Sequence, residues 1–250
     1  MERTVFTGGA VFDASGTDPA PGEVVVDGDR IVEVRSGWRE DHGPARVVNI
    51  AGRTIMPGLI ESHAHLTFPS AVGHIDPSFN PPLDVSFFHH IEGIEAELAR
   101  AERNAAILLD EGAEYGIDRA AATMMGSVAA LEAMTEIYPE IRRRGIRALP
   151  GGDYGFPNNP IGRNVRDLQL FVDLLGYSPV EALTAATRLG GQLMGMGDEL
   201  GLLAPGYLAD LLVVRGNPAE DVSLLQDAAN LEWIVQGGRA HKQPEMSQPA

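Results

Sequence analysis

The two ends of the chain are rich in β-strand signals, and this pattern constrains the fold most. Apolar stretches alternate with turn residues in TVFTGGAVFD, EVVVDGDRIVEV and RVVNIAGRTIMPG, and the pattern returns near the other end in YLADLLVVRG and LEWIVQGGRAH. Asp27-Gly28 between two of these stretches predicts a tight hairpin, because both residues tolerate the positive φ of a type I′ turn. Strand-helix units lie between the ends, so we expect the ends to combine into one β domain around an α/β middle.

The middle of the chain shows a different periodicity. Leu59–Leu66 is short and apolar with polar residues at its far end, as expected of a buried parallel strand that runs into a loop. In SPVE, Ser178 is expected to cap a helix and Glu181 to complete a capping box. The other expected elements are helices over Glu92–Glu111, Arg119–Arg144 (with a break or kink at Pro139) and Val165–Leu175, and a short strand over Ile146–Leu149.

Composition excludes several kinds of site and partner. The 250 residues include no cysteine, so any metal must be held by nitrogen and oxygen ligands. A formal charge of −16 opposes binding to nucleic acid or to anionic membrane surfaces. The chain contains no apolar run of about 18 residues and begins without a secretory pattern, so we expect a cytoplasmic protein that does not enter a membrane.

Two histidines in PGLIESHAHLTF are the first candidate ligands. His63 and His65 are separated by one residue, and residues i and i+2 of a strand project from the same face. Both imidazoles can therefore point at one cation near the end of the predicted strand. Taken alone, the pair is better explained as two ordinary polar residues at a strand end.

Three motifs together resemble the metal-dependent amidohydrolase superfamily, in particular its imidazolonepropionase-like and prolidase-like members. TIMPGLIESHAHL resembles the end of the first barrel strand in that family, with Glu61 in the usual aspartate position. GGDYG around Asp153 resembles the end of the eighth strand, and GLLAPGYLADLLVVRGNP resembles the closing signature. SPVEALTAATRLGGQLMGM is similar to the last barrel helix of the family.

The resemblance implies a fold, a site and a reaction. The fold is α/β, with an incomplete (β/α) barrel of the TIM type over residues 57–199 and a small β-sandwich built from residues 1–56 and 200–243, followed by a disordered tail over 244–250. His63, His65 and Asp153 are the implied metal ligands, and Asp153 is the implied catalytic residue that takes the proton of the attacking water. The implied metal is zinc, although the same ligands admit manganese, cobalt or iron.

The remaining ligands of the family are missing by residue type. The family completes its site with a lysine or glutamate from the fourth strand and histidines from the fifth and sixth. Lys242 is the only lysine here, and no histidine occurs from residue 91 to residue 240. About 145 residues remain for a barrel that ordinarily needs about 250, which predicts an internal deletion near Ala113–Gly116. Candidates for extra ligands are His74, His89 and His90.

Two functions follow from these observations. The first is a metal-dependent hydrolase that cleaves a C-N bond in a small amide, cyclic amide or peptide-like substrate. The second is a truncated and catalytically impaired homologue that acts as a binding or oligomerising module, or that needs a partner to complete its site. An open barrel sheet exposes unpaired strand edges, so we expect a homo-oligomer in either case.

Overall fold

The computed structural model describes residues 3–62, 127–152, 154, 162 and 164–244. Contacts divide the chain into two units, and residues 1–62, 130–150 and 165–250 form the first. Residues 63–129 and 151–164 form the second unit, in which the Tyr154 hydroxyl donates to the carbonyl of Asn164 at 3.4 Å. All strands and hydrophobic clusters described below belong to the first unit.

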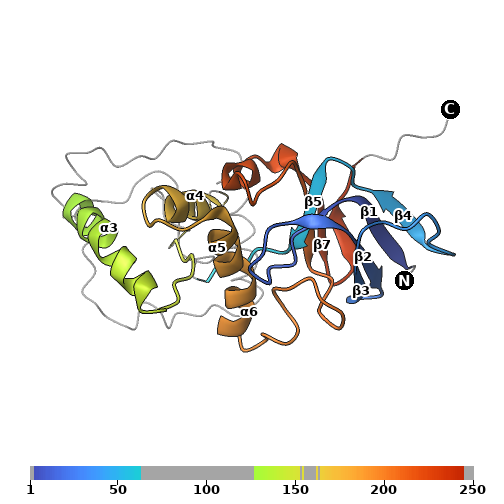
Figure 1. Cartoon of the computed structure of the whole chain (residues 1–250), viewed down its shortest axis with the longest axis horizontal. Helices are drawn as coiled ribbons and strands as arrows, with labels where there is room; N and C mark the ends of the chain where they lie inside the picture. Colours follow the sequence, from blue (N-terminus) through green and yellow to red (C-terminus); the bar gives the residue numbers. More distant parts are fainter. Residues whose placement is uncertain (1–2, 63–126, 153, 155–161, 163, 245–250) are drawn as a thin grey trace, which may run out of the picture. The chain divides into compact units, whose positions relative to one another are not determined.

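The first unit is organised around one mixed sheet that draws strands from both ends of the chain (Figure 1). Its order is β3-β2-β1-β5-β6-β7-β8, and β4 pairs with β1 off this path. The pairing of β1 with β4 and with β5 is parallel, whereas the other pairs are antiparallel. The strands are β1 (Thr4–Val11), β2 (Ala20–Asp27), β3 (Arg30–Ser36), β4 (Arg46–Asn49), β5 (Arg53–Pro57), β6 (Leu211–Arg215), β7 (Leu231–Gln236) and β8 (Arg239–Lys242).

This sheet folds back on itself, so that strands distant in the order meet. Phe6 of β1 packs edge-on against Trp233 of β7, with ring centroids 5.6 Å apart. Arg30 forms an isolated antiparallel bridge with Leu208, which joins the β3 side to the segment before β6. The resemblance implied a small β-sandwich; among the described residues, these strands are hydrogen-bonded into one sheet. A sheet that curves over its own core can bury apolar side chains as two stacked sheets do.

Alternation along β5 and β6 places side chains in two separate cores. Ile55 and Val213 belong to the cluster inside the curved sheet. Met56 and Leu212 belong to a second cluster, in which they pack with helical residues such as Leu183. Because consecutive strand residues point to opposite faces, these central strands are apolar on both faces, and a helical layer must cover the outer one.

The predicted hairpin is confirmed, but its turn lies one residue further along the chain. Asp27 pairs with Arg30, so the two-residue loop is Gly28-Asp29. Gly28 has φ +64°, and Ala14 is the only non-glycine residue with positive φ among those the structure describes. A positive φ at the first loop position alone is the pattern of a type II′ turn, which favours glycine there.

The helices confirm the capping prediction. The N–H of Glu181 donates to Ser178 Oγ at 3.2 Å, and the N–H of Ser178 donates to the Glu181 carboxylate at 2.7 Å. Pro139 was expected to break or kink its helix, yet α3 continues through it. The helical elements are α3 (Ser127–Arg143), α4 (Arg166–Asp173), α5 (Pro179–Thr184), the π-helical turn η2 (Ala185–Leu189), α6 (Gly190–Leu193), and the 3-10 turns η3 (Val222–Gln226) and η4 (Ala228–Asn230).

Two predicted strands are not formed in the described residues. Of the predicted strand Leu59–Leu66 only residues 59–62 are described, and neither they nor Ile146–Leu149 form a strand, although both were expected to be barrel strands. The N–H groups of Gly58, Ile60 and Ser62 donate to Asp210, Ala186 and Pro150 respectively. A strand needs one continuous neighbour, whereas this stretch bonds to three different segments, so it forms no ladder.

Candidate functional site

The predicted ligands lie outside the residues that the structure describes. This applies to His63, His65 and Asp153, and equally to the extra candidates His74, His89 and His90. In the described part of the chain, no group of three or more His, Asp or Glu side chains could hold a metal ion. By their chemistry, the two imidazoles and the carboxylate of the predicted ligand set suit zinc and related divalent ions.

The described flanks of the two motifs are hydrogen-bonded to each other. The Ser62 N–H donates to the carbonyl of Pro150 at 3.3 Å, and the Ser62 hydroxyl donates to the same oxygen. Ser62 immediately precedes His63 in the sequence, and Pro150 stands three residues before Asp153. Two motifs separated by almost ninety residues in the sequence thus have flanks that are neighbours in space.

Close backbone packing positions the segment that leads to Ser62. The Gly58 N–H donates to Asp210 O at 2.9 Å, and the Ile60 N–H donates to Ala186 O at 2.7 Å. A Cβ at Gly190 would lie 2.7 Å from Ile60 Cβ, which is closer than such atoms approach. A glycine at position 190 therefore allows the segment to lie against the helical layer.

The closing signature Gly201–Pro218 has a structural role in the described chain. The carboxylate of Asp210 accepts the N–H of Gly237 at 2.6 Å, while its backbone carbonyl accepts the N–H of Gly58. Gly201 has φ +93°, and a Cβ there would lie 2.4 Å from Thr187 O. These contacts join Asp210, the residue before β6, to the turn between β7 and β8 and to Gly58 at the start of the predicted barrel. The motif therefore holds separate segments together.

A buried carboxylate was missed by the sequence analysis. Glu23 in β2 is fully buried, and its Oε1 accepts the Thr7 hydroxyl at 2.7 Å, the Arg39 N–H at 2.9 Å and a bond from His42 Nε2 at 2.7 Å. Its Oε2 accepts from Arg35 at 3.3 Å. Burial alone would raise the pKa of Glu23, but these donors outweigh it and lower the pKa from 4.5 to about 2. Its partners come from four distant positions, so local sequence gave no signal for this cluster.

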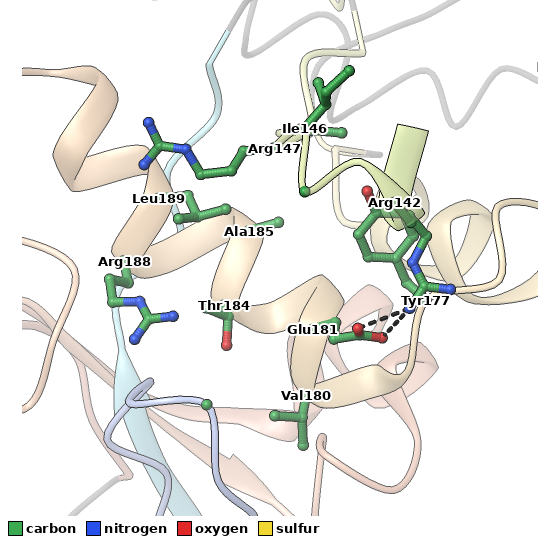
Figure 2. Close-up of a pocket in the computed structure, with 13 residues that line it drawn as sticks. Arg142, Ile146, Arg147, Tyr177, Val180, Glu181, Thr184, Ala185, Arg188 and Leu189 are labelled. Atoms are coloured by element: carbon green, nitrogen blue, oxygen red, sulfur yellow. Dashed lines mark hydrogen bonds and ion pairs between the residues drawn. The ribbon is translucent and has the colours of Figure 1, made fainter. Parts of the chain in front are cut away.

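A pocket was also missed. It has a volume of about 320 Å³ and lies along α5 and η2, between the end of α3 and Gly16 of the loop after β1 (Figure 2). On one side, both carboxylate oxygens of Glu181 accept from Arg142 at 2.8 Å, and the Arg142 guanidinium lies 4.7 Å from the centre of the Tyr177 ring. Burial is the main reason that the pKa of Tyr177 is raised, which keeps this phenol neutral.

Residues 160–240 match the model of the amidohydrolase family. Over these residues the chain is similar to the amidohydrolase family. An ochratoxinase from Aspergillus niger is 30% identical over 119 residues, which are 47% of this chain and 25% of that enzyme. An imidazolonepropionase from Aeromonas hydrophila is 33% identical over 81 residues, or 32% of this chain and 20% of that enzyme. The matched stretches thus span about a quarter or less of these curated relatives.

Solved amidohydrolases share the fold. A Xaa-Pro dipeptidase with methionine bound in its active site superimposes with a TM-score of 0.68, and the match covers 96% of this chain and 100% of that one at 14% identity. At this identity the likeness concerns the fold alone. These matches agree with the family resemblance noted in the sequence, and the expected α/β class agrees with the mixed sheet and helices described above. Within the described ranges, no helix is long and apolar enough to cross a membrane.

Proposed function

We propose that this amidohydrolase homologue hydrolyses a C-N bond in a small amide or peptide-like molecule. In this proposal residues 57–199 form a shortened (β/α) barrel, and residues 1–56 with 200–243 form its companion β domain. His63, His65 and Asp153 would hold a divalent cation, most simply zinc. The family match over residues 160–240 and the shared fold support the reaction class.

The observation that carries the proposal is the contact between Ser62 and Pro150. The proposed ligands follow these residues by one, three and three positions in the sequence. A chain spans at most about 3.5 Å per residue, so ligands this close to a shared hydrogen bond can reach one cation without rearranging the described backbone. The pairing of the two flanks also suits a barrel, in which the first and last strands must be neighbours.

The roles of the residues follow from their chemistry. His63 and His65 supply neutral imidazoles from one face of an extended segment, and Asp153 supplies a carboxylate. A divalent cation held by these three residues would supply an acidified water molecule and would polarise the substrate carbonyl. Asp153 takes the proton of the attacking water and returns it to the leaving nitrogen, so that one group serves first as base and then as acid.

Metal analysis of the purified full chain tests this proposal. We expect the wild type to retain about one or two equivalents of zinc, manganese or cobalt, the range that the implied ligand set can hold. The double variant His63→Ala, His65→Ala should lose this metal, while His241→Ala, which changes an exposed histidine of β8, should keep it. Xaa-Pro dipeptides and N-acyl amino acids are suitable substrates for the parallel activity assay, with Asp153→Asn as the variant expected to lose turnover.

The opposite results would identify the other function. A wild type that retains no metal and cleaves none of these substrates refutes the hydrolase and leaves a binding or oligomerising homologue. The proposed deletion near Ala113–Gly116 removes the middle ligands in either case. Light scattering of the same samples measures whether the chain is the homo-oligomer that an open barrel requires.

A further inference from the structure

The pocket beside α5 is lined by residues other than the proposed metal ligands and has its own polar groups. One helical face, formed by α5 and η2, provides Thr184 and Arg188, and the segment after α3 provides Ile146 and Arg147 (Figure 2). Gly16, in the loop between β1 and β2, also lines the pocket. At about 320 Å³ its volume is at the lower end of the range for small-molecule sites.

Two buried polar atoms in this pocket lack partners. Thr184 is 7% exposed, and its hydroxyl has no hydrogen-bond partner among the residues that the structure describes. The Nε of Arg188 is likewise buried and unpartnered within the described chain, although its Nη1 donates to Ser15 O at 2.8 Å. Residues four apart on a helix are neighbours on one face, so these two donors serve the same part of the pocket. Folded proteins rarely leave such groups unsatisfied.

The charge of the pocket lining determines which kind of ligand can bind to the Thr184 hydroxyl and to Arg188 Nε. Arg142, Arg147 and Arg188 line the pocket together with Glu181, and Glu181 is already paired with Arg142. The partners of the other two arginines are neutral: Arg147 donates to the Gln192 side-chain oxygen at 2.7 Å, and Arg188 donates to a backbone carbonyl. The described lining thus has two positive charges without a paired carboxylate, in a chain whose net charge is −16.

We propose that this pocket binds a small oxyanion-bearing molecule, a carboxylate or a phosphate, between the Thr184 hydroxyl and the Arg188 guanidinium. An oxyanion accepts several hydrogen bonds at once, and charge-assisted bonds from arginine are the strong ones. Arg147 adds a second positive charge at the rim. Ala185, Leu189 and Ile146 provide apolar contact for a short carbon skeleton, and Ile146 is 55% exposed.

Isothermal titration of the full-length protein tests the proposal with two oxyanions. The probes are inorganic phosphate and succinate, each measured at constant ionic strength, and succinamide is the uncharged control for succinate. We expect about one equivalent of phosphate, of succinate or of both to bind, and the probe that binds better identifies the source of the oxyanion. Bound ligand should also raise Tm, because it stabilises only the folded state.

Two variants and one matched control locate the site. Arg188→Gln should weaken binding about tenfold or more, and Thr184→Val should weaken it about threefold to tenfold, because each removes a donor to the anion. Thr184→Val is close to isosteric and removes a hydroxyl that has no partner in the described chain, so Tm without ligand should not fall. Arg239→Gln makes the same charge change on an exposed residue of β8 and should leave binding unchanged.

Three results would overturn the proposal. The first is an absence of binding by both phosphate and succinate to the wild type. The second is equal weakening by Arg239→Gln and Arg188→Gln, which would show a general charge effect rather than a site. The third is binding of succinamide as tight as that of succinate, which would show that the oxyanion is not recognised.

Discussion

Replacing Glu23 by glutamine should destabilise the protein by about 3 kcal/mol at neutral pH. The pKa of this carboxyl falls from 4.5 to about 2 in the folded state, and each pKa unit corresponds to about 1.4 kcal/mol. The structure gives the cause: three donors meet one oxygen and Arg35 meets the other, inside a fully buried site. Glutamine removes the charge and also presents an N–H₂ group where donors already point, so at least one of them loses its acceptor.

The lowered pKa of Glu23 also determines how the stability difference between the wild type and Glu23→Gln depends on pH. Because the folded-state pKa lies below the unfolded-state value, the unfolded chain binds the proton first as the pH falls. The contribution of Glu23 is therefore complete above about pH 5 and disappears progressively towards pH 2. Urea denaturation of the wild type and of Glu23→Gln at several pH values measures the difference in unfolding free energy directly.

A matched carboxylate on the neighbouring strand provides the control. Glu33 also binds Arg35, and this hydrogen bond lowers its pKa, but its side chain is 36% exposed. Glu33→Gln should consequently cost much less than Glu23→Gln, because solvent screens an exposed pair. Equal losses for the two variants, or a loss for Glu23→Gln that stays constant from pH 7 to pH 3, would refute the assignment of the stability to this buried cluster.

Two further predictions concern the closure of the sheet and the start of α5. Gly237 and Gly238 have φ +52° and +72°, but only a Cβ at Gly238 would meet an atom, at 1.9 Å from Gly28 O. In denaturation experiments Gly237→Ala should cost about 1–2 kcal/mol for its left-handed backbone, and Gly238→Ala about 1–3 kcal/mol more; equal costs would contradict the described contact. Ser178→Ala should lower the unfolding free energy by about 1 kcal/mol through loss of the cap, and an unchanged value would mean that Glu181 alone caps the helix.

Local signals in the sequence were sufficient where a structure is made by neighbours in the chain. The hairpin between β2 and β3 and the capping box at Ser178 depend on residues within a few positions of each other, and both are present. The turn was displaced by one residue because glycine fits the first loop position of a type II′ turn. Residue propensity is a reliable guide to the presence of a turn. It is a poorer guide to which residue occupies each position of that turn.

Long-range pairing could not be predicted in the same way. Nothing in the apolar pattern of β1 indicates that β5 will lie beside it in parallel, or that Phe6 will touch Trp233. Leu59–Leu66 was predicted to be a strand because it begins with apolar residues, yet in its described part and the residue before it the N–H groups of Gly58, Ile60 and Ser62 bond to three separate segments. Periodicity reports which face of a segment is buried, and it does not report how many partners cover that face.

The candidate sites also depend on residues that are far apart in the sequence. His63, His65 and Asp153 were found through a family resemblance, and their place in the structure stays a prediction. Glu23 reads as an ordinary charged residue ahead of three valines, because its partners lie up to 19 positions away. Thr184 reads as one more small residue of an amphipathic helix. Only its burial and its missing partner within the described chain distinguish it.

The topology explains how a chain with the proposed deletion can keep a folded scaffold. Every strand of the sheet comes from residues 4–57 or 211–242, and the strands of the two ends adjoin where β5 pairs with β6. The loss of residues near Ala113–Gly116 therefore removes no strand from this sheet and opens neither of its central pairings. The flanks of the shortened middle also stay tied to each other through Ser62 and Pro150. A deletion there would cost the proposed barrel its middle ligands and would leave all eight strands of the sheet in place.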